Sequence, residues 1–326
     1  MSSTSIPLSR ARVKAGAIPW SEIRGFNYQP SYSSSDIESW QLFDPVTIDR
    51  ELERGKRYFP NMNAIRIWHS WAAFSRGPEQ YAEKFEQELA IADKHGLVCM
   101  PVLFNRWHDY GQDWGGIYFD HFLPGLSWVQ SEGMWDRYLE LIVGAHADDP
   151  RIFCWDLCNE PFSYTLPLEE VPQTIVDAEY EWLKAIRDGC KAFSPVAPIG
   201  ISTHPNHGIA GERLVEPLCD ILLIHTYSNE DGIVDQYVEL AREVDKPILS
   251  TEACWGADED DERVRIIEGS LSMLKERNIG WLVHILHHSL TSDAHRPEFG
   301  PVNRPGFHFI DEDGSLRPGH DVFNRY

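Results

Sequence analysis

The stretch that decides the fold is residues 152–161, which read Ile152-Phe153-Cys154-Trp155-Asp156-Leu157-Cys158-Asn159-Glu160-Pro161. Its apolar character predicts a buried strand over Ile152–Asn159. Pro161 has no backbone N–H and stops the strand, so Glu160 is expected to project from the edge of a sheet. Residues 247–256 repeat this pattern, because a buried run over Pro247–Thr251 leads directly into a single acidic residue, Glu252.

Short apolar strands alternate with helical patterns along the whole chain, which is typical of βαβ units and a parallel sheet. The other predicted strands are Arg24–Tyr28, Ala64–Trp68, Leu97–Phe104, Ala197–Ile201, Asp220–His225 and Gly280–Leu286. The predicted helices are Thr47–Tyr58, Pro78–Lys94, Met134–His146, Val171–Phe193, Gly208–Val215, Ile233–Val244 and Glu259–Arg277. Eight strands with helical crossovers fit a closed barrel better than an open sheet, and no G-x-G-x-x-G follows the first strand. We therefore predict the α/β class and a single (β/α)8 TIM-barrel domain over residues 1–326, with residues 1–20 as an N-terminal extension.

The longest connection without a helical pattern follows the third strand, from Asn105 to about Gly133. It is rich in aromatic residues, namely Trp107, Tyr110, Trp114, Tyr118, Phe119 and Trp128. A loop of this length at the C-terminal face of a barrel usually has a function, although packing on its own aromatic side chains would also explain it.

The composition limits the partners of the protein. The chain carries 51 acidic and 29 basic residues, a net charge of −22, so we expect no nucleic-acid partner and no binding to anionic membranes. The first 20 residues have no apolar core of a signal peptide, and no run is long enough to span a membrane. Six scattered cysteines indicate free buried thiols in a reducing compartment, which predicts a cytoplasmic protein. Cys154 and Cys158 should share one face of their strand, but no second pair accompanies them and zinc is not expected.

Reactive groups of barrel enzymes sit at the C-terminal ends of the strands. Glu160 and Glu252 occupy such ends three strands apart, on opposite walls of one barrel mouth. Either residue alone could be merely solvated. Two together indicate a pair of carboxyl groups that face each other.

Asn159-Glu160-Pro161 at the end of the fourth strand and a lone Glu252 at the end of the seventh resemble clan A of the glycoside hydrolases, most closely glycoside hydrolase family 5, the cellulase and mannanase family. The resemblance runs from Gly25-Phe26-Asn27 to Asp311-Glu312-Asp313-Gly314. Further matching positions are Arg66 in Ile65-Arg66-Ile67-Trp68, and His225 with Tyr227.

The resemblance implies a retaining glycosidase that cleaves a β-glycosidic bond of a carbohydrate without a cofactor or metal. It makes Glu160 the acid/base and Glu252 the nucleophile, two carboxyls that retaining hydrolysis needs ~5–5.5 Å apart. Arg66 would keep Glu252 ionised, and Tyr227 would position it. His225 would lie beside Glu160 or a sugar hydroxyl, and Asn159 would donate to the sugar 2-hydroxyl.

His108 and Trp255 are further candidates for sugar binding. A structural role stays open for four of these residues. Arg66 could form an ion pair at the end of its strand, His225 could be a core histidine, and Tyr227 could be an aromatic residue at the rim. The fourth is His108.

The eighth strand departs from the family pattern, because His284 stands where relatives usually carry a platform tryptophan. A smaller, polar ring changes which sugar fits. His284, His287 and His288 also raise the question of a metal, but a strand would place His284 and His288 on one face and His287 on the other.

Two other functions stay in view. One is a metal-dependent barrel hydrolase that uses His108, Asp109, His204, His207 and His225; the other is a non-catalytic carbohydrate-binding barrel. The identity of the sugar, exo or endo action and the oligomeric state are not determined by the sequence.

Overall fold

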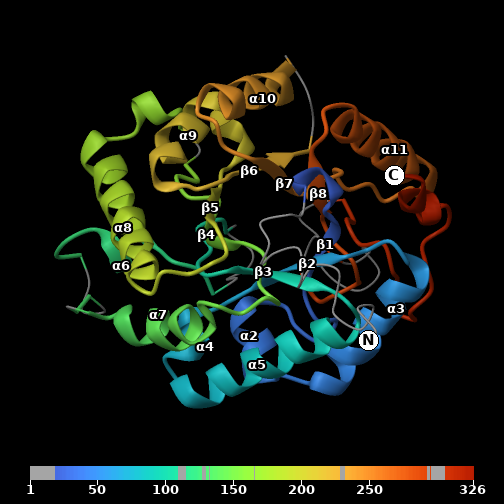
Figure 1. The fold of residues 1–326 in the computed structure, drawn as a ribbon, viewed down its shortest axis with the longest axis horizontal. Coiled ribbons are helices and arrows are strands. Elements are labelled where there is room, and N and C mark those ends of the chain that lie inside the picture. The colour runs from blue at the N-terminus through green and yellow to red at the C-terminus, as the bar shows by residue number, and fades with distance from the viewer. Residues whose placement is uncertain are drawn as a thin grey trace, which may run out of the picture.

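The chain forms a closed barrel of eight parallel strands in a computed structural model, which describes residues 19–108, 115–126, 130–131, 133–164, 166–227, 232–291, 294 and 305–326. The strands are β1 (Arg24–Tyr28), β2 (Ala64–Trp68), β3 (Val98–Val102), β4 (Trp155–Asn159), β5 (Ile199–Ser202), β6 (Leu222–Thr226), β7 (Ile248–Ala253) and β8 (Gly280–Val283). Each strand pairs with its successor, and β8 pairs with β1 to close the ring. The predicted (β/α)8 fold is confirmed, and Figure 1 shows the helices packed around the barrel.

The helices that cover the barrel are mostly those that the sequence predicted. The longer ones are α3 (Pro45–Tyr58), α5 (Pro78–Lys94), α7 (Asp136–Ile142), α8 (Gln173–Ala192), α9 (Gly208–Val215), α10 (Ile233–Glu243) and α11 (Asp260–Glu276). The α3 helix begins at Pro45, and the carboxylate of Asp44 caps it by accepting a hydrogen bond of 3.0 Å from Val46 N. Short 3-10 helices connect several elements: Trp20–Glu22, Gly144–His146, Leu168–Glu170, Pro205–His207, Glu216–Leu218 and His320–Arg325.

Three short helices were not predicted: α2 (Asp36–Gln41), α4 (Trp71–Phe74) and α6 (Phe119–Phe122), the last within the long connection after β3. The α2 helix had a signal in the sequence, because Ser35 and Glu38 have the spacing of a capping box. The Ser35 hydroxyl indeed accepts from Glu38 N at 3.2 Å.

One predicted boundary was wrong in a place that matters for the site. The eighth strand was predicted to reach Leu286, but it ends at Val283, so His284 is the first residue of the loop. Trp20, the last residue of the predicted N-terminal extension, begins a 3-10 helix, and its ring packs against Phe153. Residues 1–18 lie outside the described residues, as do Asp109, Tyr110, Trp114 and Trp128.

Strand alternation divides the barrel core into two layers. Side chains on the outer face pack against the helices, as Ile65 and Trp281 do. A second cluster fills the lower barrel: Ile23, Ala64, Val98, Met100, Phe153, Cys154, Ile221, Leu223, Leu249 and Leu282. This packed floor leaves the upper, C-terminal mouth for polar groups.

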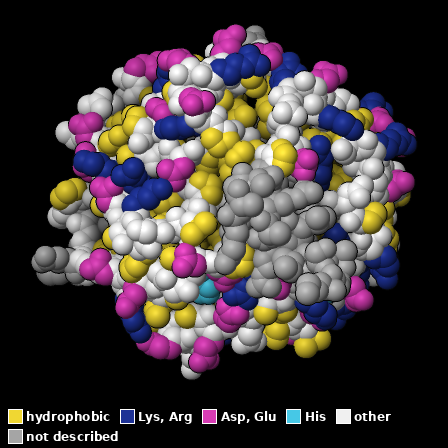
Figure 2. Space-filling view, viewed as in Figure 1, with side chains coloured by type: hydrophobic (Ala, Val, Ile, Leu, Met, Phe, Trp, Pro, Cys, Tyr) yellow, Lys and Arg dark blue, Asp and Glu magenta, His cyan; other side chains and the backbone are white. Residues whose placement is uncertain are grey.

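The surface carries side chains of both charges. On the face shown in Figure 2, acidic and basic side chains are interspersed around the edge. Within the described ranges, no helix is both long enough and apolar enough to cross a bilayer.

Candidate active site

Glu160 stands directly after β4, where the backbone leaves the strand. Its φ of +47° lies in the left-handed region, which is uncommon for a residue other than glycine. Its backbone N–H donates to Ser202 O at 2.7 Å, which fixes the turn against β5. The residue is 5% exposed, and its Oε1 lies 2.7 Å from His225 Nδ1. Glu160 is therefore a buried carboxyl held at the mouth by a neighbouring imidazole.

Glu252 lies on β7 and is also 5% exposed. Arg66 Nη1 donates to its Oε1 at 2.6 Å, and the Tyr227 hydroxyl donates to its Oε2. Burial alone would raise the pKa of this carboxyl, but the charges of His225, His284 and Arg66 and the hydrogen bond from Tyr227 lower it to about 2. Glu252 is thus held in its ionised form.

Arg66 is fully buried on β2, and all five of its N–H groups have partners. Besides Glu252, they reach Asp156 Oδ2 twice, at 2.8 and 3.1 Å, Asn27 Oδ1 at 2.8 Å and Asn159 Oδ1 at 2.7 Å. Two carboxylates neutralise the guanidinium, which makes its burial tolerable. This network ties β1, β2, β4 and β7 together beneath the mouth.

The two glutamates face each other across a short gap. His225 Nδ1 lies between them, 2.7 Å from Glu160 Oε1 and 3.5 Å from Glu252 Oε2. A side-chain oxygen of Glu160, one of Glu252 and a ring nitrogen of His225 all lie within 4.8 Å of one another. So short an approach of two carboxyl oxygens suits a retaining glycosidase, whose carboxyl groups lie ~5–5.5 Å apart, better than an inverting one, whose carboxyl groups lie ~6.5–9.5 Å apart.

Irregular strand pairing directs both glutamates toward each other. The register shifts between Asp156 and Asn159 on β4, and between Ser250 and Ala253 on β7. Such bulges re-aim side chains and are frequent next to active sites. The β4 shift also separates Cys154, in the barrel floor, from Cys158, which packs in the outer layer. The prediction that these cysteines share a face was therefore wrong.

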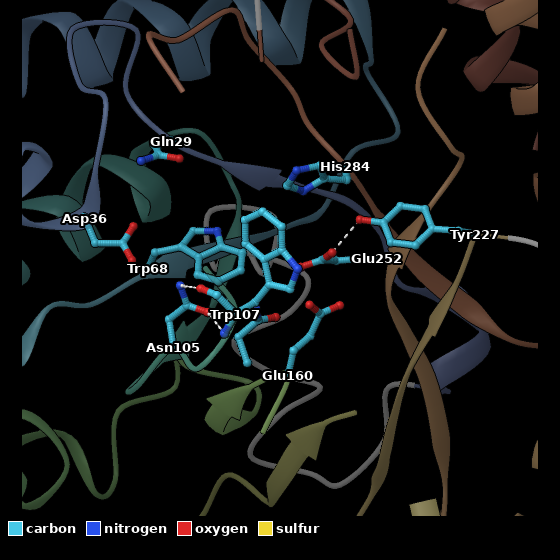
Figure 3. Close-up of a pocket in the computed structure, with 10 residues that line it drawn as sticks. Gln29, Asp36, Trp68, Asn105, Trp107, Glu160, Tyr227, Glu252 and His284 are labelled. Carbon is cyan, nitrogen blue, oxygen red and sulfur yellow. Dashed lines mark hydrogen bonds between the residues drawn. The ribbon is translucent and has the colours of Figure 1, made fainter. Parts of the chain in front are cut away.

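A cavity of about 480 Å³ opens above the pair (Figure 3). It is lined by Gln29, Asp36, Trp68, Asn105, Trp107, Asn159, Glu160, Tyr227, Glu252 and His284. The predicted residues Asn159, Tyr227 and His284 thus lie around the two glutamates, with Arg66 and His225 in contact with them.

Two predicted residues lie elsewhere. His108 is exposed, its Nδ1 lies 3.1 Å from Arg106 O, and its ring packs against Tyr118. Trp255 is 39% exposed and packs edge-on against Tyr227 and Phe307. It lines a second hollow, on the β5–β7 side of the mouth.

Five lining residues were missed: Gln29, Asp36, Trp68, Asn105 and Trp107. Gln29 follows β1 directly and Trp68 ends β2, so a stricter reading of strand ends would have found them. Asp36 had no such signal, because it comes from the short helix α2.

The histidines after β8 do not form the predicted strand pattern, because that strand ends before His284. His287 is buried, and its Nε2 lies 2.8 Å from Arg54 Nη1. The His288 ring packs against His308. Among the described residues, the groups spaced to hold a metal are Glu160 with His225 and Glu252, and Glu86 with His146 and Asp149.

The curated proteins that the chain resembles include several mannan endo-1,4-beta-mannosidases. No profile of a known protein family matches the chain. It is 32% identical over 87 residues to a probable mannan endo-1,4-beta-mannosidase C from Aspergillus terreus, covering 24% of this chain and 20% of that protein. It is 26% identical over 110 residues to mannan endo-1,4-beta-mannosidase A from Podospora anserina, covering 31% and 28%. The chain spans about a fifth of the length of the curated relatives that it matches first.

Solved structures extend the likeness to nearly the whole chain. An exo-beta-1,4-mannosidase from an Opitutaceae bacterium superposes with a TM-score of 0.67 at 19% identity, over 92% of this chain and 58% of that one. A glycoside hydrolase family 5 mannosidase from Rhizomucor miehei gives 0.61 at 13% identity, over 93% and 92%. The resemblance to glycoside hydrolase family 5 is confirmed. At these identities the superpositions establish the (β/α)8 barrel fold, and the activity has to be argued from the site.

Proposed function

We propose that the protein is a retaining O-glycosyl hydrolase that cleaves a β-glycosidic bond by double displacement. The observation that carries this proposal is the pair of buried carboxyls, with oxygens within 4.8 Å and with different environments. Glu252 has an arginine and a tyrosine hydroxyl as partners, whereas Glu160 pairs with imidazoles. Glu252 is held ionised, as the nucleophile of this chemistry has to be.

In the first step, the Glu252 carboxylate attacks the anomeric carbon while Glu160 gives its proton to the departing glycosidic oxygen. The C–O bond to the leaving group breaks, and an ester between Glu252 and the sugar forms. In the second step, Glu160 takes a proton from water as the water oxygen attacks the anomeric carbon and releases Glu252. His225 Nδ1 contacts Glu160 Oε1 at 2.7 Å. An imidazole nitrogen can donate to a carboxylate or accept from a carboxylic acid, so this contact can persist as Glu160 gains and loses a proton in each cycle.

The substrate that we propose is a β-mannosidic bond in a soluble glycoside or oligosaccharide, because the relatives are named for mannan and mannosides. Asn159 lies at the cavity wall, where its amide Nδ2 donates one hydrogen bond to Asn105 Oδ1 at 3.0 Å. The amide has a second N–H, which we assign to the sugar 2-hydroxyl. A cytoplasmic location is part of the proposal, supported by six cysteines that are all free and buried.

The metal-dependent alternative has one observation in its favour, because Glu160, His225 and Glu252 have the spacing of a metal site. The Arg66 guanidinium already neutralises Glu252, however, and a dication beside it would meet an adjacent positive charge. Of the other ligands considered, His108 is exposed, and His204 Nε2 lies 3.8 Å from Glu160 Oε2. Activity that survives dialysis against a strong chelator would exclude this alternative.

The decisive variant is Glu252→Ala, assayed on activated aryl β-glycosides. Without its nucleophile the enzyme should lose several orders of magnitude in turnover, and azide should partly restore it by forming a glycosyl azide. Glu262→Ala, on the exposed first turn of α11, is the matched control and should keep full activity. Loss of activity without rescue by azide or formate would count against the assignment of Glu252.

Glu160→Ala tests the second carboxyl separately. Removal of a general acid should slow substrates with poor leaving groups far more than aryl glycosides with good ones. Equal losses on both kinds of substrate would contradict its role as acid.

A further inference from the structure

Two hollows flank the carboxyl pair, and they differ in which strands supply their walls. The 480 Å³ cavity extends toward β1 and β2 and contains Gln29, Asp36 and Trp68. The second hollow has about 1440 Å³ of space on the β5–β7 side and is lined by residues such as His207, Gln236 and Trp255. His225 and Tyr227 border it, so it begins where the carboxyl pair ends.

The chemistry of the proposed reaction assigns a part of the substrate to each hollow. The sugar that is attacked must lie over Glu252 with its leaving oxygen toward Glu160. Glu160 lines the first cavity, and its Oε2 lies 3.8 Å from His204 Nε2, next to Pro205 at the edge of the second hollow. The leaving group therefore departs into the second hollow, and the attacked sugar occupies the cavity toward β1 and β2.

That cavity ends at two polar side chains, each with one buried atom that has no hydrogen-bond partner within the part of the chain that the structure describes. Asp36 is 2% exposed and Gln29 is 4% exposed. Among the described residues, neither Asp36 Oδ2 nor Gln29 Nε2 has a hydrogen-bond partner. Buried polar atoms without a partner cost free energy, and such atoms in native proteins usually bind water or a ligand. In Figure 3 both residues lie across the pocket from Glu160 and Tyr227, with Trp68 beside them.

The fold holds Asp36 firmly in this position. It is the first residue of α2, whose preceding Ser35 caps the helix. The loop after β3 packs directly on the same turn, because a Cβ on Gly115 would lie 2.4 Å from Ile37 Cγ1. Asp36 is therefore presented to the cavity by two packed segments, as a specificity-determining side chain has to be.

We propose that Asp36 and Gln29 bind hydroxyl groups at the far end of the attacked sugar and thereby select an uncharged glycone. This inference rests on the proposed function. A carboxyl oxygen accepts from a hydroxyl, and an amide N–H donates to one, so together they match two hydroxyls of a sugar ring. Every N–H of Arg66 is engaged, so this guanidinium is not available to the carboxylate of an anionic glycone such as a uronic acid.

The test combines variants with deoxygenated substrates. Wild type, Asp36→Asn and Gln29→Ala are assayed on 4-nitrophenyl β-mannoside and on its 3-, 4- and 6-deoxy analogues. Asp136→Asn is the matched control, since Asp136 also opens a helix, α7, but is exposed. Thermal melts confirm that each variant is folded.

We expect Asp36→Asn to lower kcat/KM on the parent glycoside about tenfold to a hundredfold. For wild type, removal of one particular hydroxyl from the substrate should lower kcat/KM about as much as Asp36→Asn does. The variant should show no further loss on that deoxy analogue. On the other deoxy analogues, wild type and Asp36→Asn should lose activity by the same factor. Gln29→Ala should give the same pattern for the same or the adjacent hydroxyl, and Asp136→Asn should behave as wild type.

If Asp36→Asn lowers kcat/KM by the same factor on the parent glycoside and on every deoxy analogue, or does not lower it at all, this inference is overturned. The proposed function is unaffected by that result as long as wild type is active. The inference is likewise overturned if wild type cleaves a β-glucuronide as readily as the neutral glycosides. A wild type that cleaves no glycoside would overturn both.

Discussion

The floor and the mouth of the barrel are made by the same eight strands, yet they follow different rules. In the floor, buried apolar side chains from several strands pack into one cluster, as Ala64, Leu223 and Leu249 illustrate. At the mouth, the same strands present buried charges such as Arg66 and Asp156, and the register of β4 and β7 shifts. The floor stabilises the fold by burying apolar area. Burial of the charges at the mouth costs free energy, and the stability from the floor offsets this cost.

The largest effect is expected at the mouth, from Arg66→Met. This change removes the arginine partner of both Asp156 and Glu252, and breaking a buried ion pair costs about 3–5 kcal/mol. The pKa of Glu252 should also rise, and its carboxylate loses the donor that orients it, so kcat/KM should fall sharply. Chemical denaturation and kcat/KM measure the two losses; if stability were unchanged, the charges would not be as tightly coupled as their distances indicate.

Leu223→Ala breaks the floor instead. It removes a fully buried side chain from the apolar cluster and should cost about 2–5 kcal/mol of unfolding free energy. The carboxyl pair sits above this layer, so kcat at a temperature where the variant is folded should stay within about twofold of wild type. A large fall in kcat would show that the floor and the mouth are not independent.

Tyr227→Phe sharpens the comparison within the mouth. It removes one hydrogen bond to a charged oxygen, which should lower kcat/KM by about tenfold to a hundredfold. Since this bond helps to lower the pKa of Glu252 to about 2, the acidic limb of the pH–rate profile should move to higher pH. An unmoved acidic limb would separate Tyr227 from the ionisation of the nucleophile.

The last comparison concerns a buried carboxyl, Glu88, that has no ion pair among the described residues. Glu88, on α5, is 5% exposed, and burial raises its pKa from 4.5 to about 8. The folded state holds this proton more tightly than the unfolded state, so the contribution is fully present below pH 4.5 and is lost as pH rises toward 8. Glu88→Gln should therefore flatten the decline of melting temperature between pH 5 and 8. If the melting temperature of Glu88→Gln declines as steeply as that of wild type, groups other than Glu88 cause the decline.

The regular part of the molecule could be predicted from the sequence because it obeys simple periodicities. All eight strands were identified, and β1, β2 and α9 have the predicted bounds. The α5 helix begins at its proline and ends at Lys94, also as predicted. The ends of β3 and β8 were predicted too long, because apolar residues continue past the point where strand pairing stops.

The site could be predicted in part, because its principal residues follow strand ends. Arg66, His225, Tyr227, Glu160 and Glu252 were named together, and the structure brings them into contact. Cys158 shows what periodicity misses, since the register shift on β4 turns it to the opposite layer from Cys154. Asp36 could not be found, because only the packing of α2 against the loop after β3 brings it to the cavity.

The account depends on double displacement between Glu160 and Glu252, and the configuration of the first product tests this most directly. Proton NMR during the hydrolysis of a β-glycoside should show the β-anomer of the free sugar first, with the α-anomer appearing only as mutarotation proceeds. Immediate release of the α-anomer would mean a single displacement by water, and Glu252 could not then be the nucleophile.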